Sequence, residues 1–290
     1  MKSLSLRLTA VFCIFLCLTA CVVPAASVSA NECCGALDLT FSGEFCCMTR
    51  GGKRVAPASL TKLLTALTAL DLCAPDEPLT VGTEQALVHP NSSLSLIREG
   101  HVLTLYDLLS AMLLVSGNDA AYALAANLGR RLGGESLSDE AAIKAFVDKM
   151  NEKAVALGLE DSHFTTPDGW DDENQYTIVR DLLRIGAAAW ENETIREIVG
   201  RHEYFCTFVS GETITWTNSN AFLDPDSPYY DPNVKGLKTG TTDKAGKCLL
   251  AVFEKNGRTI LTCVVGAKTD AGRYESTLAL FRQCTQNEKD

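Results

Sequence analysis

The chain has 290 residues, of which 46% are hydrophobic and 21% charged, and its formal net charge at pH 7 is −10. This length and apolar content support one large or two modest folded domains with a real core, and they argue against a disordered chain. The acidic balance and the lack of a Lys/Arg-rich run argue against a nucleic-acid-binding surface, so no nucleic-acid partner is expected.

Residues 1–30 form the first predicted element, a secretory signal peptide. Two basic residues precede an apolar run over residues 8–18, which is too short for a membrane-spanning helix and is followed by small residues. Two processing sites compete. Cleavage after Ala30, favoured by Pro24 and the small residues behind it, would give a secreted chain, whereas the lipobox-like stretch LTAC would leave a lipid on Cys21 as a membrane tether.

After the signal peptide, a β-hairpin is expected over residues 36–40 and 44–49, because their connection FSG is a turn signal. Ser59 to Leu72 is strongly apolar and predicts a buried helix. Periodicity and the content of Ala, Leu and Lys predict four more helices, over residues 105–115, 118–131, 138–157 and 177–190.

The texture changes after Gly200, where β-branched and aromatic runs are separated by Gly, Asn and Pro. A hairpin signal at Asn256-Gly257 joins two of the runs, and a final helix over residues 271–286 closes the chain. Strands at both ends predict an α/β (α+β) fold: one sheet built from the two termini, an inserted helical lobe, and a cleft between them. The strands are expected over residues 201–209, 212–218, 248–255 and 258–267.

Nine cysteines follow Ala30, an odd number that cannot pair completely within one chain: Cys33, Cys34, Cys46, Cys47, Cys73, Cys206, Cys248, Cys263 and Cys284. Vicinal cysteines such as Cys46 and Cys47 are expected to alternate faces on a strand. The sequence has no CxxC and no His-rich spacing, so no metal site is expected. Most of the nine are therefore predicted to be small buried hydrophobic residues, with one or two disulfides left open.

The stretch SLTK at residues 59–62 stands at the start of the buried helix and suggests more than a helix cap with a surface lysine. A serine hydroxyl is a weak nucleophile until a base removes its proton. Residues three apart on a helix share a face, about 5 to 6 Å apart between Cβ atoms, so Lys62 can reach Ser59. Burial beside a second cation such as Lys238 is expected to lower the pKa of Lys62 enough for it to act as a base. The backbone N–H groups of Ser59 and Thr241 would bind a developing oxyanion.

Two further stretches complete a set whose members are weak signals alone. SGN at residues 116–118 lies in a break between predicted helices, and taken alone it is explained more simply as a helix cap. KTG at residues 238–240 lies in an extended stretch, and taken alone it is explained more simply as the end of a strand. Their order and separation after Ser59 argue against a chance combination. Acyl-transfer chemistry then predicts a proton relay to the leaving amine at Ser116, a hold on the substrate amide at Asn118, and contacts with a substrate carboxylate at Lys238, Thr239 and Gly240.

The chain resembles low-molecular-mass penicillin-binding proteins of the D-alanyl-D-alanine carboxypeptidase type, the S11 serine peptidases. The resemblance covers residues 32–286 and implies a β-lactamase/DD-peptidase-like fold, with an antiparallel sheet of about five strands flanked by helices. It also implies one catalytic domain over residues 31–290, outside the cytoplasm at the cell wall, with no cofactor or metal. The matching stretches are RVAPASLTKLLTALTAL, LLVSGNDAAYALA, MNEKAVALGLEDSHFTTPDGW, TNSNAFL and GLKTGTTDKAGKCLLAVF.

The resemblance implies a serine carboxypeptidase that acts on peptidoglycan stem pentapeptides. Ser59 would attack the bond between the two terminal D-alanines, D-alanine would leave, and water would release the trimmed peptide from the acyl-enzyme. β-Lactams would acylate the same serine. Family members also hold the terminal carboxylate with an arginine near the last helix, which implies this role for Arg273. Many relatives carry an additional C-terminal β domain, which this chain, ending at Asp290, is expected to lack.

Three other functions remain open. A class A β-lactamase would use a glutamate in an ExxLN stretch for deacylation, and none occurs between the SGN and KTG stretches. A DD-endopeptidase that cuts crosslinks would share all three motifs. A catalytically silent muropeptide-binding protein would have no need of Lys62.

Other polar residues near these motifs are expected to be structural. His163, in DSHFTTPDGW, is the histidine most easily mistaken for a general base, but the sequence lacks a GxSxG nucleophile elbow. Asn218 and Asn220 are expected to organise a strand-to-loop turn near the cleft.

Overall fold

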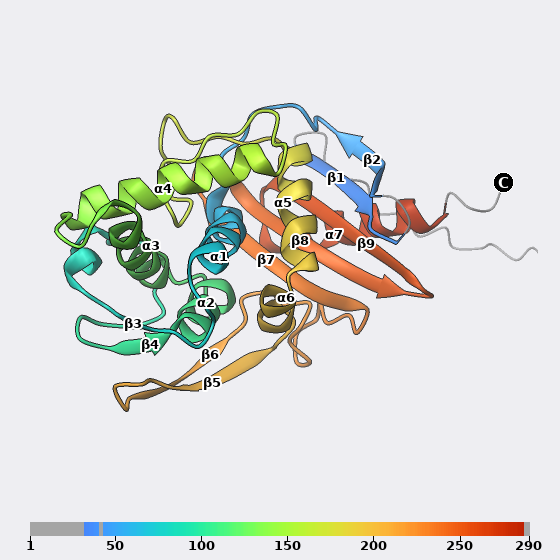
Figure 1. The fold of residues 1–290 in the computed structure, drawn as a ribbon. Coiled ribbons are helices and arrows are strands. Elements are labelled where there is room, and N and C mark those ends of the chain that lie inside the picture. Colours follow the sequence, from blue (N-terminus) through green and yellow to red (C-terminus); the bar gives the residue numbers. More distant parts are fainter. Residues whose placement is uncertain (1–31, 41–42, 287–290) are drawn as a thin grey trace, which may run out of the picture.

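The computed structural model describes residues 32–40 and 43–286. The predicted signal peptide, residues 1–30, and the lipobox cysteine Cys21 lie outside the described residues, so both remain predictions. Within the described part of the chain, no helix combines the length and the apolar character needed to cross a membrane. A central sheet carries helices on both faces, and a helical lobe lies beside it (Figure 1).

A five-stranded antiparallel sheet forms the centre of the fold, in the order β2-β1-β9-β8-β7. Its N-terminal strands are β1 (Cys33–Asp38) and β2 (Glu44–Thr49), and its C-terminal strands are β7 (Val234–Thr242), β8 (Gly246–Lys255) and β9 (Arg258–Ala267). β1 pairs with β9, so strands from opposite ends of the chain are neighbours. The predicted sheet built from the two termini is confirmed.

Helices cover both faces of this sheet because its central strands are apolar on both sides. Successive side chains of a strand point to opposite faces. Along β8, Leu249 and Phe253 lie in the core beneath α7 (Asp270–Gln286), whereas Leu250 lies in the larger core shared with α5 (Val179–Glu191). Figure 1 shows α5 in front of the sheet and α7 behind it.

The helical lobe surrounds α1, which is buried from Thr61 to Ala69. The predicted buried helix is confirmed, although its α-helical part begins at Thr61, and Ser59 lies in the 3-10 turn before it. Two of the surrounding helices approach closely at Gly129, where a Cβ would lie 1.8 Å from the carbonyl oxygen of Ala142. The helices of the lobe are α1 (Thr61–Leu72), α2 (Leu105–Leu114), α3 (Asn118–Gly133) and α4 (Asp139–Ala156).

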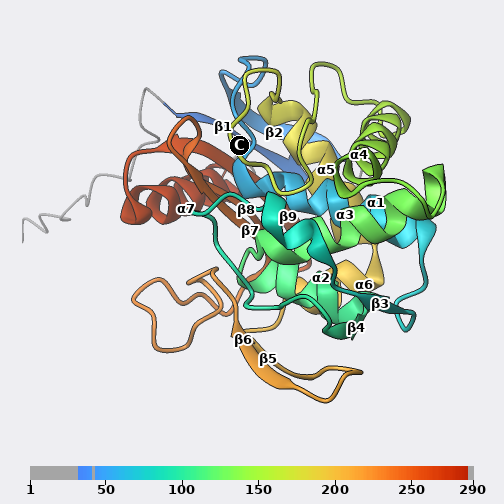
Figure 2. The same cartoon turned by 90° about the vertical axis from the view of Figure 1, so that its left-hand side faces the viewer.

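The structure departs from the predicted elements where strands or helices are short. The strands expected over 201–209 and 212–218 are β5 (Glu203–Thr207) and β6 (Thr213–Thr217), which pair only with each other as a hairpin outside the main sheet (Figure 2). Four further elements were not predicted, because a periodic pattern of hydrophobic residues can be recognised only over segments longer than these. These unpredicted elements are β3 (Pro78–Thr80), the 3-10 helix η2 (Thr83–Leu87), β4 (Val102–Thr104) and α6 (Glu193–Val199).

The nine cysteines after Ala30 are free thiols, and seven of them are buried, as predicted for small hydrophobic residues. The expectation that Cys46 and Cys47 point to opposite faces is wrong. β2 carries a β-bulge: Cys47 faces Ala36 and Phe45 faces Leu37, so Cys46 is the extra residue between two paired ones. As a result, both vicinal cysteines pack against the core cluster that contains Cys284 on α7, and Cys47 Sγ lies 3.9 Å from Cys284 Sγ.

Candidate active site

Ser59 lies in the 3-10 turn η1 (Ala58–Leu60), which leads directly into α1. Ala58 has a φ of 49°, in the left-handed region that a residue with a Cβ adopts only at some energetic cost. The turn packs against β7, where a Cβ on Gly240 would lie 3.3 Å from the amide nitrogen of Ser59. Glycine at this position therefore lets β7 approach the Ser59 turn, and Thr241 lines the same small cavity as Ser59.

Lys62 is fully buried one turn into α1, and its ammonium group has three acceptors. Lys62 Nζ lies 2.9 Å from Ser59 Oγ, 2.7 Å from Asn118 Oδ1 and 2.7 Å from the carbonyl oxygen of Asp168. Burial lowers the pKa of Lys62 to about 8, although the nearby carboxylates of Asp168 and Asp119 act in the opposite direction. The spacing of SLTK thus brings an amine of unusually low basicity to the serine hydroxyl.

The cause expected for this pKa shift was burial beside a second cation, Lys238. The burial is confirmed as the cause, whereas Lys238 is not among the groups that lower the pKa of Lys62. The repulsion acts on Lys238, whose pKa is lowered well below its ordinary value by burial first, then by the charges of Lys62 and Arg273. Lys238 is 1% exposed, and its Nζ donates to the carbonyl oxygen of Thr239 at 3.1 Å.

The SGN stretch forms the connection between α2 and α3. Ser116 is buried with a φ of 64°, and Gly117 follows it where a Cβ would lie 2.9 Å from the carbonyl oxygen of Ala111. Asp119 fixes this connection, because its buried carboxylate accepts hydrogen bonds from the amides of Ser95 and Ile97. The tight backbone presents Asn118 to Lys62, which explains why a small residue separates Ser116 from Asn118.

The turn at residues 168–170 belongs to the site and was not predicted. Gly169 has a φ of 87°, and a Cβ there would lie 1.9 Å from the carbonyl oxygen of Ala58, so the turn rests directly on the backbone beside Ser59. Thr65 Oγ1 holds the turn from α1 by donating to the carbonyl oxygen of Pro167 at 2.6 Å. The run PDG predicts a turn here. It does not predict that the turn contacts Lys62, because the contact is made by a backbone carbonyl group, which every residue type has.

The KTG strand meets two further elements at its carboxyl end. Thr239 Oγ1 lies 2.6 Å from Ser219 Oγ, in the loop after β6. Arg273, on the first turn of α7, is 9% exposed and donates through Nη1 to the carbonyl oxygen of Gly240 and to Thr241 Oγ1, both at 3.4 Å. Three buried basic side chains, those of Lys62, Lys238 and Arg273, therefore lie near one another, an arrangement that favours an anionic ligand.

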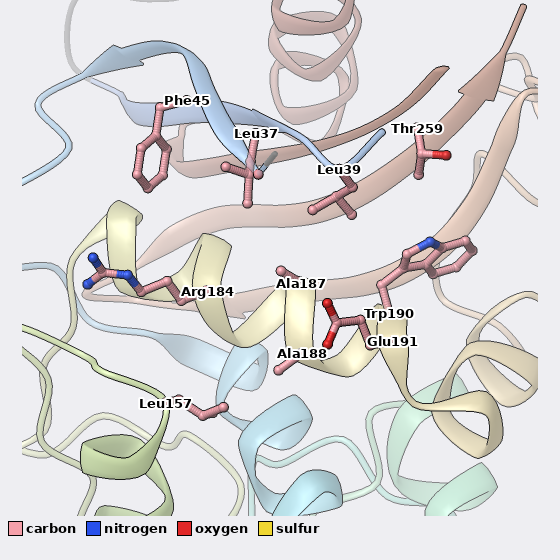
Figure 3. A pocket seen from close by; sticks show the side chains of 11 residues that line it. Leu37, Leu39, Phe45, Leu157, Arg184, Ala187, Ala188, Trp190, Glu191 and Thr259 are labelled. Atoms are coloured by element: carbon pink, nitrogen blue, oxygen red, sulfur yellow. The ribbon is translucent and has the colours of Figure 1, made fainter. Parts of the chain in front are cut away.

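The cavity at Ser59 is small, about 60 Å³, and lined almost entirely by polar residues. Its walls include Asn118, Asp168 and Trp170, whose ring stacks on His89 with centroids 4.0 Å apart. A much larger hollow of about 720 Å³ lies elsewhere, between β1, β2 and α5 (Figure 3). It contains none of the predicted site residues. Among the described residues, no cluster of His, Cys, Asp and Glu could hold a metal ion.

The other polar residues considered in the sequence have structural contacts. Asn218 donates to the carbonyl oxygens of Val199 and Arg201 and accepts from the amide of Asn220, so it organises the turn after β6. The backbone of His163 pairs with that of Tyr176 in an isolated antiparallel β-bridge, so His163 has a structural role.

Comparison with known proteins identifies the family. Residues 42–269 match the family described as D-alanyl-D-alanine carboxypeptidase, peptidase S11. D-alanyl-D-alanine carboxypeptidase DacD of Escherichia coli (strain K12) is 34% identical over 245 residues, 80% of this chain and 57% of the relative. DacF of Bacillus subtilis (strain 168), which bears the same enzyme name, is 30% identical over 224 residues, 76% of this chain and 54% of the relative. The chain therefore spans about half the length of these two curated relatives.

The fold is also that of a solved structure. The crystal structure of the Streptomyces K15 DD-transpeptidase superimposes with a TM-score of 0.79 at 28% identity, covering 90% of this chain and 97% of that one. The similarity extends over the sheet and the helical lobe alike. With the match over residues 42–269, these findings establish that the chain belongs to the D-alanyl-D-alanine carboxypeptidase family, peptidase S11.

Proposed function

We propose that this protein is a serine D-alanyl-D-alanine carboxypeptidase that removes the terminal D-alanine from peptidoglycan stem peptides through an acyl-enzyme on Ser59. The observation that carries the proposal is the contact between Ser59 Oγ and Lys62 Nζ at 2.9 Å, made by a fully buried lysine whose pKa falls to about 8. A lysine of ordinary basicity would stay protonated at neutral pH and could not take the serine proton.

The hydrogen bonds of Lys62 also orient it for this role. A neutral amine keeps two N–H donors and gains one lone pair. Asn118 Oδ1 and the carbonyl oxygen of Asp168, each 2.7 Å from Nζ, would take the two donors, which leaves the lone pair to accept the proton of Ser59 Oγ. Asn118 would thus position the base as well as hold the substrate amide, the role that its place in the SGN stretch predicts.

The remaining residues would stabilise the charges of the reaction. The oxyanion of the tetrahedral intermediate would receive the backbone N–H groups of Ser59 and Thr241, which line one cavity. The terminal carboxylate of the substrate would meet the charges of Lys238 and Arg273 and the hydroxyl of Thr239. Ser116 would carry the proton to the departing D-alanine.

Covalent labelling with a fluorescent penicillin tests the proposal, because a β-lactam would acylate the same serine. We expect one label per chain in the wild type and none in Ser59→Ala. Ser138→Ala removes a serine that caps α4, so it controls for the loss of a hydroxyl and should label normally. Equal labelling of Ser59→Ala and the wild type, with both folded by circular dichroism, would refute Ser59 as the nucleophile.

The fate of the acyl group separates related activities. Release of free D-alanine from a stem pentapeptide without cleavage of crosslinked dimers is expected for a carboxypeptidase. Cleavage of the dimers would instead favour an endopeptidase. Joining of the trimmed peptide to an added amine would favour the transfer reaction for which the Streptomyces K15 enzyme is named. Rapid turnover of the penicillin itself would favour a β-lactamase.

The proposed substrate requires export, for which residues 1–30 are the predicted signal. Fractionation of cells that express the whole chain, followed by mass spectrometry of the mature N-terminus, tests this proposal. A chain that starts at Asn31 would support cleavage after Ala30, whereas a lipid-modified Cys21 would support a membrane tether. An uncleaved chain confined to the cytoplasm would contradict both.

A further inference from the structure

Three cysteines gather where β2 meets the last turn of α7, at the side of the sheet away from the helical lobe (Figure 1). Cys47 Sγ lies 3.9 Å from Cys284 Sγ, although 237 positions separate the two residues in the sequence. Cys46 packs against the same core cluster, which contains Cys284, and its Sγ donates to the carbonyl oxygen of Glu44 at 3.9 Å. Two neighbouring thiols on a strand thus lie beside one thiol on a helix.

The β-bulge in β2 is what makes this sharing feasible. A regular strand would send Cys46 and Cys47 to opposite faces, but the bulge inserts Cys46 as an unpaired residue beside the register pair Cys47 and Ala36. Both thiols then meet the face of the sheet that α7 covers. Bulges re-aim side chains in this way at functional positions.

The three thiols differ in accessibility and acidity. Cys46 and Cys47 are half-buried and open to small reagents, whereas Cys284 is buried. Hydrogen bonds from Cys284 lower the pKa of Cys46 and of Cys47, and the Cys284 pKa rises correspondingly. The accessible members of the cluster are therefore the ones that a small disulfide reaches first, and their thiolates are the reactive species in disulfide exchange.

Charged neighbours hold the backbone of the cluster in place. Arg258 at the start of β9 donates through Nη1 to the carbonyl oxygen of Cys284 at 3.2 Å and forms an ion pair with Asp38 on β1. This bridge fixes the last turn of α7 against the ends of the neighbouring strands β1 and β9.

We propose that Cys46, Cys47 and Cys284 form a thiol–disulfide exchange site, in which a small-molecule disulfide oxidises the cluster and Cys284 becomes bonded to Cys47 or to Cys46. The product would tie the end of α7 to the N-terminal hairpin. The third thiol would remain free to attack this bond and to exchange partners. The proposal does not depend on the peptidase function.

The reaction proceeds in two exchange steps. The thiolate of Cys47 attacks one sulfur of the disulfide R–S–S–R, so that a bond to Cys47 forms and the S–S bond of the reagent breaks, releasing R–S⁻. Cys284 then loses its proton, and its sulfur attacks the sulfur of Cys47, displacing the second R–S⁻. Each released thiolate takes up one proton. Two protein thiols are oxidised to one disulfide, and R–S–S–R is reduced to two R–SH.

The bond would stabilise the fold more than it would affect the Ser59 site. It closes a loop that spans most of the chain, which removes conformational entropy from the unfolded state. Arg273 lies on the first turn of the same helix, eleven residues before Cys284 and thus about 16 Å away along the helix axis. We expect a rise in Tm and an unchanged rate of penicillin labelling.

Oxidised glutathione added to the full chain tests the proposal. Two thiols per chain should become inaccessible to alkylation. A digest under non-reducing conditions should contain a disulfide-linked peptide that joins the segments around Cys47 and Cys284. The Tm should rise on the order of 10 °C, and dithiothreitol should reverse all three changes. Cys284→Ser and Cys284→Ala should both lose the link and the Tm rise, with two variants tested because either alone could perturb α7.

Matched variants sharpen the assignment. Cys46→Ser should keep the link through Cys47, and Cys47→Ser should form it through Cys46, whereas the double variant should not form it. Cys73→Ser is the control, because Cys73 Sγ contacts Glu77 Oε2 at 3.2 Å in another part of the fold and a hydroxyl can replace it. Oxidation that leaves a stable glutathione adduct in the wild type in place of the link, or a Tm rise that persists in both Cys284 variants, would overturn the proposal.

Discussion

The cavity at Ser59 measures about 60 Å³, and the polar side chains and carbonyl groups around it bond to one another, whereas the hollow beside α5 measures about 720 Å³ and has walls of mixed polar and apolar surface. In the small cavity, Lys62 has an acceptor on the Ser59 turn, on α3 and on the turn at Asp168. In the large one, Arg184 and Glu191 line the hollow from α5 together with Ala187 and Ala188 (Figure 3). Catalytic geometry here comes with close packing, so cavity size is a poor guide to the site.

The largest expected effect comes from removing the buried amine. Lys62→Met keeps the length and burial of the side chain but has no base, so penicillin labelling should slow about 10³-fold. Arg184→Met makes the same kind of change in the large hollow and should label at the wild-type rate. Stopped-flow or gel-based labelling measures both rates. If Lys62→Met were labelled at a rate within a few-fold of the wild type, the small cavity would contain no base that labelling requires, and it would not differ from the large hollow in this respect.

The next largest effect comes from adding one methyl group to the turn on Ser59. A Cβ at Gly169 would lie 1.9 Å from the carbonyl oxygen of Ala58, so Gly169→Ala must displace the turn, and labelling should slow on the order of 10²-fold. Gly43→Ala is the matched change at the large hollow, where φ is also positive but nothing lies within 4 Å of the added Cβ. It should lose some stability and no activity. Equal rates for the two variants would contradict the close-packing argument.

The pH dependence of labelling should report the amine at Ser59. Lys62 must be neutral to accept the proton, and its pKa of about 8 means that the neutral fraction grows as pH rises toward that value. The second-order labelling rate should therefore rise roughly 50-fold between pH 6 and pH 8 and level off above it. A rate that stays flat over this interval would indicate that Lys62 is not the titrating base.

The smallest expected effect comes from filling the large hollow. Ala188→Leu adds apolar atoms in a space of about 720 Å³, so it should raise the free energy of unfolding by about 1 kcal/mol without changing the labelling rate. Urea denaturation measures the stability. A marked fall in labelling would mean that the hollow communicates with Ser59.

Sequence reasoning succeeded where the determining interaction is local. The three-residue spacing of Ser59 and Lys62 predicted their contact, and Asn256-Gly257 predicted the β8–β9 hairpin, because each depends on a few successive residues. The apolar run after Ser59 predicted a buried helix for the same reason. The five-stranded sheet followed from the β-branched runs near both ends.

The rest of the site depends on contacts between distant segments. Asp168 contributes a backbone carbonyl, which any residue could supply, so its side chain gives no signal. Gly169 matters because of Ala58, more than a hundred positions earlier. The expected burial of Lys62 does lower its pKa, but Lys238 is not among the causes, because the balance of charges around a buried amine is a property of the packed core rather than of the motif.

The pairing of β1 with β9 also dictates when the chain becomes chemically competent during synthesis. Cys33 must wait for Val265, which the ribosome adds more than two hundred residues later. Until then, β7 and β8 cannot pack within the finished sheet against the Ser59 turn that leads into α1, and Lys62 of an unfolded chain is hydrated, with the basicity of an ordinary lysine. The last strands to be made therefore complete the fold in which the pKa of Lys62 is lowered. An incomplete or unfolded chain contains Ser59 without an effective base.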